Sequence, residues 1–144
     1  MNRYCIVVLT LFFLISCEVP FGNNRMGYEE LNEPLFSSWR IVSSHKYIPD
    51  NNDYWKSPIE FERDGGGDCE DFAIALVYRL GQESSMVFIR TATNVHALVE
   101  WHNFYVDPQI FMSFYRVENI KIIRVYNYDD TMKEATRWGT KAID

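Results

Sequence analysis

Two stretches of the chain carry apolar residues every three or four positions, which is the spacing of one face of an α-helix. The first begins at Asn32-Glu33-Pro34, a typical helix start, and its stripe comprises Leu35, Phe36, Trp39, Val42 and, at its far end, Tyr47. The second begins after Asp68 and stops at Gly81, and its stripe comprises Phe72, Ala73, Leu76, Val77 and Leu80. We expect both stripes to face the core.

The segment between these helices, residues 48–64, contains Pro49, Trp55 and Pro58. We expect it to be a loop that borders the functional cleft. After Gly81 the pattern changes to short runs rich in β-branched and aromatic residues, at 86–92, 95–101, 104–107 and 120–128. These runs predict an antiparallel sheet. A short helix is expected over 130–139, with Trp138 packing back on the core, so the fold class is α+β.

The N-terminus has the pattern of an export signal. Arg3 is its only charge, and the apolar run Cys5–Ile15 is shorter than the ~20 residues that a transmembrane helix needs. The run ends in Leu14-Ile15-Ser16-Cys17, which resembles a bacterial lipobox, where the signal is cut before a cysteine that becomes lipidated. We expect a signal peptide at 1–16, a polar tether at 17–31 and one domain at 32–144. The alternative is a plain signal peptide with a chance cysteine.

This pattern predicts a protein of the bacterial cell envelope that is anchored to a membrane through lipid on Cys17. The net charge of −6 comes without any basic cluster, which disfavours nucleic acid as a partner. The glycine run 65–67 is not a phosphate loop, because it lacks the following Lys-Ser/Thr. Acidic residues flank it on both sides and would repel a nucleotide.

Cys69 is the cysteine with a chemical reason to be free. The chain has three cysteines, of which Cys5 leaves with the signal and Cys17 is lipidated. Cys69 lies in the first turn of the second helix, where the helix dipole and free N–H groups stabilise a thiolate and could hold an oxyanion. The neighbouring carboxylates of Asp68, Glu70 and Asp71 act in the opposite direction. A cationic partner is therefore needed to bring the thiol pKa below its ordinary ~8.5.

His96 is the expected partner. If His102-Asn103 forms a two-residue hairpin turn, Trp101 pairs with Phe104 and Leu98 with Asp107, so His96 and Asp107 share a face of the sheet. Their backbones are then about 7–8 Å apart on the diagonal, within reach of an imidazole and a carboxylate. A nucleophile Cys69, a base His96 and an orienting Asp107 form a catalytic triad. The other two histidines, His45 and His102, are expected at the surface.

Several of these segments resemble the bacterial transglutaminase-like cysteine proteinases. The resemblance rests on residues 47–50, 53–61, 65–73, 96–99 and 105–107, of which Gly67-Asp68-Cys69-Glu70-Asp71 is the most specific block. It implies a papain/transglutaminase-like α+β core, in which the nucleophile helix packs on an antiparallel sheet. It also implies a triad of Cys69, His96 and Asp107. The chain departs from the family in Pro108, where these proteinases commonly have Asn, and its segments between the motifs are short.

The resemblance has further implications for the site. Members of the family include periplasmic proteases that cleave surface adhesins, and some bind calcium through acidic residues beside the cysteine. In this chain those residues are Asp68, Glu70 and Asp71, whose simpler role is to cap the helix. No other cofactor is expected. Trp55, Gly67 and Asp68 are candidates for lining the cleft or the oxyanion hole, although Trp55 could equally anchor its loop.

The sequence therefore predicts an envelope-anchored thiol hydrolase that cleaves peptide or amide bonds of a protein or peptide through a thioester acyl-enzyme. One alternative is transglutaminase-type acyl transfer to an amine, since the same thioester can react with either nucleophile. Another is a non-catalytic binding lipoprotein that keeps the fold. A zinc site at Cys69, His96 and Asp107 is disfavoured, because no fourth ligand is evident.

Overall fold

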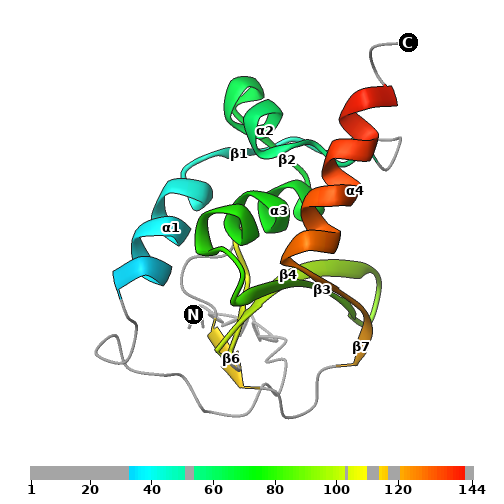
Figure 1. The fold of residues 1–144 in the computed structure, drawn as a ribbon. Helices are drawn as coiled ribbons and strands as arrows, with labels where there is room; N and C mark the ends of the chain where they lie inside the picture. The colour runs from blue at the N-terminus through cyan, green and yellow to red at the C-terminus, as the bar shows by residue number, and fades with distance from the viewer. Residues whose placement is uncertain (1–32, 51–53, 103, 110–113, 117–120, 142–144) are drawn as a thin grey trace, which may run out of the picture.

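The computed structural model describes residues 33–50, 54–102, 104–109, 114–116 and 121–141 (Figure 1). The predicted signal peptide, the tether and Cys17 lie outside the described residues. Within the described part of the chain, no helix has both the length and the apolar character needed to cross a bilayer.

A five-stranded sheet forms one layer of the domain. Its strand order is β6-β5-β4-β3-β7, and every neighbouring pair is antiparallel. The strands are β3 (Ser84–Arg90), β4 (Val95–Trp101), β5 (Phe104–Val106), β6 (Phe114–Arg116) and β7 (Ile122–Asn127). Four of them coincide closely with the apolar runs of the sequence, whereas β6 was not expected.

Helices form the second layer. They are α1 (Glu33–Ser43), α2 (Pro58–Asp64), α3 (Cys69–Leu80) and α4 (Tyr128–Lys141), and a short parallel pair, β1 (Lys46–Tyr47) and β2 (Gly66–Gly67), precedes α3. Figure 1 shows α3 across one face of the sheet, with α1 and α4 on either side of it. The α+β architecture predicted from the sequence is confirmed, with the nucleophile helix packed on the antiparallel sheet.

The core lies between α3 and the sheet. Seven consecutive residues of α3, Asp71–Val77, are buried, and they meet Met86, Ala97 and Val99 from the sheet. This near-continuous burial explains why α3 is apolar beyond a single stripe. Its predicted ends are also correct, since Asp68 and Gly81 are its caps.

The first helix was predicted correctly except at its far end. Leu35, Trp39 and Val42 are buried along one face of α1, as their spacing indicates. Tyr47 does not belong to that stripe: it lies in β1 and is 58% exposed. Helix α1 ends at Ser43, so Tyr47 falls beyond its last turn.

The expected loop at 48–64 contains a helix, α2, so this prediction was wrong in part. Ser57 and Glu60 form a capping box, in which Ser57 Oγ accepts from Glu60 N (3.3 Å) and Glu60 Oε2 accepts from Ser57 N (2.8 Å). Pro58 adds the fixed φ that favours a first helical position. The helix predicted at 130–139 is likewise longer, since α4 spans Tyr128–Lys141. The packing of Trp138 lies outside the described side chains.

Two glycines allow β2 to approach both of its neighbours closely. Gly66 has φ 141°, and a Cβ there would collide with the carbonyl of Lys46 in β1. A Cβ on Gly67 would collide with the side chain of Asp71 in α3. The glycine run therefore lets β1 and the first turn of α3 lie directly against the strand that leads into Cys69.

Candidate active site

Cys69 is the first residue of α3 and is half-buried. Its Sγ donates a hydrogen bond to Glu70 Oε2 at 2.9 Å. The backbone N–H of Ala97 in β4 donates to the same sulfur. The helix N-terminus thus brings the thiol against β4, at the residue that follows His96.

His96 and Asp107 are joined as the sequence predicted. His96 Nε2 lies 2.8 Å from Asp107 Oδ2. The β4–β5 register pairs Val99 with Val106 and Trp101 with Phe104, so the predicted register is confirmed. Because Nε2 is engaged with the carboxylate, Nδ1 is the ring nitrogen left to exchange a proton with another group.

Asp107 is fixed on three sides. Its side chain is almost wholly buried, and its second oxygen, Oδ1, accepts from Gln109 N at 2.9 Å. Its backbone carbonyl accepts from Trp39 Nε1 at 3.3 Å. This carboxylate therefore holds one orientation toward His96, which is what an orienting group requires.

The structure does not show the thiolate that was expected at Cys69. Burial, the hydrogen bond to Glu70 and the charges of Glu70 and Asp68 raise the pKa of the thiol to about 12, against an opposing contribution from the Ala97 N–H. The thiol is therefore protonated at neutral pH in this state. Among the described residues, its side-chain partner is the Glu70 carboxylate, while His96 is paired with Asp107.

The carboxylates around the thiol differ in their environments. Burial, followed by the charges of Glu70, Asp71 and Asp50, raises the pKa of Asp68 to about 8. Burial also raises the pKa of Asp71, to about 6, although two backbone N–H groups stabilise its charged form: Lys56 N at 2.7 Å and Asp68 N at 3.3 Å. Asp71 thus links the 54–57 segment to the start of α3 through these two hydrogen bonds.

The three acidic residues proposed for calcium are not equally suited to it. Within the described part of the chain, no three His, Cys, Asp or Glu side chains are arranged to hold a metal ion. Both oxygens of Asp71 already accept from backbone N–H groups. Asp68 Oδ1, in contrast, is buried and has no hydrogen-bond partner among the described residues. Asp68 and Glu70 could therefore supply carboxylate oxygens as ligands to a cation, whereas Asp71 could not.

The other cleft candidates have clear surroundings. Trp55 is half-buried, with its ring centroid 5.7 Å from that of Phe88 and 5.3 Å from that of Tyr126, so it anchors its segment on the sheet. Phe88 pairs with Ala97, which places this aromatic cluster next to the thiol. The N–H of Asp68 is already engaged by Asp71 and is not available to an oxyanion. The N–H of Cys69, in the first turn of α3, has no partner within the helix.

Sequence reasoning missed Lys56. Its Nζ donates to the carbonyl of Gly66 at 2.8 Å and lies 3.5 Å from Asp64 Oδ2, while its backbone N–H binds Asp71. Lys56 therefore holds in place the glycine strand that leads into Cys69. Nothing in the sequence pattern indicates this, because the contacts join segments that have no common periodicity.

The remaining histidines are not part of this site. His45 Nε2 lies 3.1 Å from Glu62 Oε2. The surface position expected for His45 was wrong, because its side chain is only 14% exposed and its ring packs 4.7 Å from that of the buried Phe61. His102 lies in the β4–β5 turn, 2.9 Å from Glu83 Oε2, and about half of its side chain is exposed. The surface position expected for His102 is confirmed.

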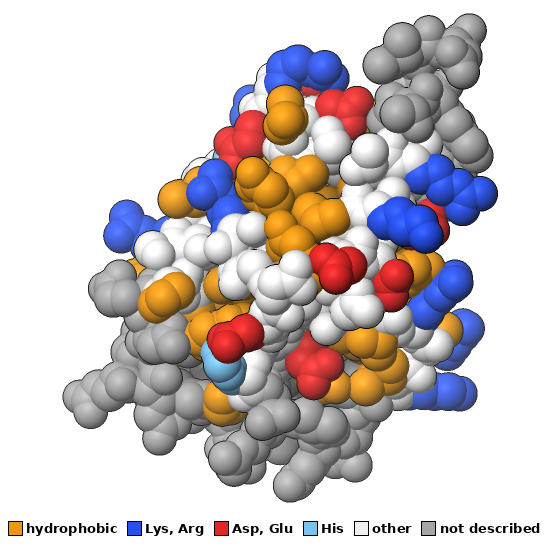
Figure 2. All heavy atoms as spheres, in the orientation of Figure 1, with side chains coloured by type: hydrophobic (Ala, Val, Ile, Leu, Met, Phe, Trp, Pro, Cys, Tyr) orange, Lys and Arg blue, Asp and Glu red, His pale blue; other side chains and the backbone are white. Residues whose placement is uncertain are grey.

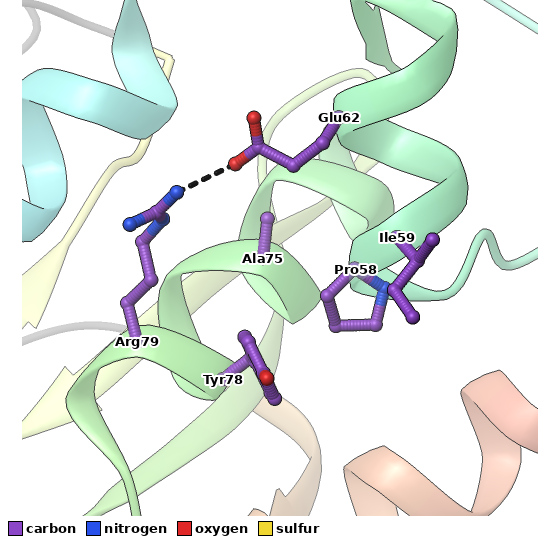
Figure 3. Close-up of a pocket in the computed structure, with 6 residues that line it drawn as sticks. All are labelled: Pro58, Ile59, Glu62, Ala75, Tyr78 and Arg79. Atoms are coloured by element: carbon purple, nitrogen blue, oxygen red, sulfur yellow. Dashed lines mark hydrogen bonds and ion pairs between the residues drawn. The ribbon is translucent and has the colours of Figure 1, made fainter.

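A separate hollow of about 260 Å³ lies between α2 and α3. Figure 3 shows its lining, with the Arg79–Glu62 ion pair (2.6 Å) on one side. Figure 2 shows apolar side chains gathered over the same helices, where Ile59 and Tyr78 are exposed. None of the predicted site residues lines this hollow.

Comparison with known proteins identifies the fold. No family model and no curated protein matches the chain. Solved structures of LapG from Legionella pneumophila do match it, with 24% sequence identity: an EGTA-treated form and a calcium-bound form, both with TM-score 0.58, and a third structure with TM-score 0.56. The matches cover 65% of this chain and 62–64% of LapG, so the chain spans less than two thirds of that protein.

LapG is a transglutaminase-like cysteine protease, which is the kind of protein that the sequence motifs resemble. The likeness shows that this chain has the transglutaminase-like fold. The resemblance found in the sequence and the arrangement of the helices and strands therefore agree.

Proposed function

We propose that this protein is a cysteine hydrolase of transglutaminase-like type that cleaves peptide or amide bonds of a protein or peptide in the bacterial cell envelope. The main support is the His96–Asp107 hydrogen bond of 2.8 Å. The residue that follows His96, Ala97, contacts the Cys69 sulfur through its N–H, so the imidazole lies on the strand that the thiol meets. A buried carboxylate, an imidazole and a thiol at a helix N-terminus are the parts of a thiol-dependent acyl transfer site.

In the proposed reaction His96 accepts the thiol proton at Nδ1, and the Cys69 sulfur forms a bond to the scissile carbonyl carbon. The carbonyl oxygen becomes negative, and the N–H of Cys69 at the start of α3 stabilises it. His96 then gives its proton to the leaving nitrogen as the C–N bond breaks, and Asp107 stabilises the imidazolium in between. Water attacks the thioester and releases the acid, which regenerates the thiol.

The resting thiol donates to Glu70, so the catalytic cycle begins with the transfer of that hydrogen bond from Glu70 to His96. The transfer is a local change, because Glu70 and Cys69 are adjacent in the first turn of α3. In the substrate-free protein Glu70 therefore keeps the thiol protonated and inhibits its reaction.

Acylation by p-nitrophenyl acetate and alkylation by iodoacetamide test this proposal. Cys69→Ala should abolish both reactions at this residue, and His96→Ala should slow acylation by ~10²-fold or more, since general-base catalysis contributes 10²–10⁴-fold. His45→Ala is the matched control, because His45 also contacts a carboxylate but lies outside the site. Acylation of the parent that does not depend on His96 would contradict the triad.

Calcium binding is a second candidate function. It is favoured by the buried Asp68 Oδ1, which has no hydrogen-bond partner in the described part of the chain, by the raised pKa of Asp68 and by the existence of a calcium-bound form of LapG. Asp68 and Glu70 would supply oxygen ligands, and a bound cation would supply positive charge beside the thiol. Thermal denaturation in Ca²⁺ and in EGTA tests this: Ca²⁺ should raise the melting temperature of the parent but not of Asp68→Asn. An equal effect of Mg²⁺ would indicate general charge screening.

We also propose that the chain is a lipoprotein, on the basis of the Leu14–Cys17 motif behind the apolar run. Metabolic labelling with a fatty acid should mark the parent, and Cys17→Ser should lose the label and leave the membrane fraction. Cys5→Ser is the matched control. Unchanged labelling of Cys17→Ser would exclude this anchor.

A further inference from the structure

Tyr47 lies beside the nucleophile, and the proposed mechanism does not yet use it. β1 and β2 pair in parallel with Tyr47 opposite Gly67, and Ile48 N donates to Gly67 O at 2.8 Å. Gly67 is followed by Asp68 and Cys69. The backbone of Tyr47 is therefore fixed against the strand that leads directly into the thiol.

The register also sets the direction of the Tyr47 side chain. Residues directly opposite each other in a ladder project to the same face of the sheet. A Cβ on Gly67 would run into the Asp71 side chain, so this face of β2 looks toward the first turn of α3. Tyr47 consequently projects toward the start of α3, and with 58% of its surface exposed it is accessible to a substrate.

The phenol is also in the right protonation state to donate a hydrogen bond. Burial, followed by the ionisable groups of Cys69, Asp68, Glu70 and Asp50, raises the pKa of Tyr47 above its ordinary value of 10.0. The phenol is therefore neutral at physiological pH. Three of these groups are Cys69 itself and its neighbours Asp68 and Glu70, so the hydroxyl shares the electrostatic surroundings of the thiol.

The site needs such a donor. The N–H of Asp68 is engaged by Asp71 Oδ2 and that of Ala97 by the Cys69 sulfur, so of these three backbone donors only the Cys69 N–H is left for an oxyanion. A negative oxygen formed there would also be repelled by Glu70, which is adjacent to the nucleophile. A neutral O–H group offsets this repulsion without adding a charge.

We propose that Tyr47 is a catalytic residue: its phenol O–H donates to the scissile carbonyl oxygen as that oxygen becomes negative, beside the N–H of Cys69. This inference rests on the proposed thiol hydrolase function and deepens it. It assigns the second donor of the oxyanion hole to β1, a segment of the chain that precedes the nucleophile by 22 positions in the sequence.

Two reactions of the same thiol test the role of Tyr47 in the full chain. Acylation of Cys69 by p-nitrophenyl acetate passes through a tetrahedral oxyanion, in which the C–S bond forms before p-nitrophenolate leaves. Alkylation by iodoacetamide displaces iodide and forms no oxyanion. Tyr47→Phe removes only the hydroxyl, so it should slow acylation by about 10²-fold, the typical loss of one oxyanion donor, and leave alkylation unchanged. Tyr78→Phe, at a similarly exposed tyrosine, should alter neither rate.

Each other outcome overturns the inference in a distinguishable way. If Tyr47→Phe is acylated at the parent rate, the phenol is not an oxyanion donor, while the thiol hydrolase proposal stands. If Tyr47→Phe slows acylation and alkylation equally, Tyr47 acts on the thiol or on the fold instead. If Cys69 of the parent is not acylated either with Ca²⁺ or in EGTA, the proposed function fails, and the role of Tyr47 fails with it.

Discussion

The Cys69 thiol is exposed to two opposing electrostatic effects at once. The N-terminus of a helix stabilises a nearby negative charge by about 0.3–1 kcal/mol, which is less than one pKa unit, since one unit corresponds to about 1.4 kcal/mol. Burial and the Glu70 carboxylate act against it and raise the pKa to about 12. The position of a cysteine at a helix start is therefore not sufficient to make it a thiolate, and the neighbouring side chain decides the outcome.

Glu70→Gln should activate the thiol. The substitution removes the negative charge of Glu70 and replaces the carboxylate that accepts the thiol proton with a neutral amide, a weaker acceptor. The charge and the hydrogen bond both raise the pKa of Cys69 in the parent, so this pKa should fall. Each pKa unit by which the substitution lowers this value increases the thiolate fraction at neutral pH about tenfold. The rate of iodoacetamide alkylation against pH measures this, with Glu62→Gln as a control on α2. An identical pH profile for Glu70→Gln and the parent would show that Glu70 does not hold the thiol in solution.

Asp107→Asn should keep the fold and lose most of the acyl transfer activity. Asparagine retains an oxygen for the Gln109 N–H, but its amide cannot balance the charge of an imidazolium at His96. Loss of the orienting carboxylate costs ~10⁴-fold in kcat in serine proteases, and a loss of orders of magnitude is expected here. Acylation by p-nitrophenyl acetate measures the effect, and thermal denaturation controls for folding. A normally folded Asp107→Asn with the parent rate would remove Asp107 from the mechanism.

At the scale of elements, the glycine strand β2 has little room for side chains, because β1 and α3 lie directly against it. Gly66→Ala places a Cβ against the Lys46 carbonyl at φ 141°, so β1 must move away. We expect a loss of about 1–3 kcal/mol in the free energy of unfolding, the usual cost of such strained backbone, together with slower acylation of Cys69. Gly65→Ala is the matched control, because its φ of 75° is also strained but a Cβ there meets nothing within 4 Å.

Urea denaturation and p-nitrophenyl acetate acylation of both variants check this prediction. Gly65→Ala should lose stability by about 1–2 kcal/mol and keep its acylation rate, since only the backbone strain applies. Equal acylation rates in the two variants would show that the β1–β2 contact does not support the site.

The elements that the sequence predicted are those with strong local signals. The cap residues Asp68 and Gly81 predicted both ends of α3. The turn predicted at His102 gave the strand register that brings His96 and Asp107 together. Helix α2 was missed although its capping box was readable. The β1–β2 pair was not predictable, because a two-residue ladder has no alternation and Tyr47 continued an apolar spacing from α1.

At the scale of the whole molecule, the candidate site is assembled from segments that are distant in the sequence. The start of α3 supplies Cys69 and β4 supplies His96, Asp107 directly follows β5, and β1 carries Tyr47. The residues of the proposed triad could be named from the sequence because each has a chemical signature. The choice of Glu70 as the partner of the thiol could not, since it depends on side-chain packing around a buried group.

The same cluster of carboxylates should affect the stability of the whole domain. Asp68 has a pKa of about 8 in the folded protein, against 3.8 for the ordinary group, so the folded state binds more protons than the unfolded state between these values. Stability then falls as pH rises from about 4 through about 8, because unfolding releases the buried carboxyl to ionise. Asp71, with a pKa of about 6, contributes with the same sign.

Asp68→Asn should flatten this dependence, since an amide is neutral at every pH. Urea denaturation at about pH 5 and about pH 8 should show a smaller loss of stability in Asp68→Asn than in the parent. Asp64→Asn is the matched control, because Arg63 lowers the pKa of Asp64 below its ordinary value, so this carboxyl is ionised at both pH values and its replacement should leave the dependence between them unchanged. A parent that is equally stable at both pH values would mean that Asp68 ionises freely in the folded protein. The unpartnered oxygen at the start of α3 would then be solvated or bound to a cation.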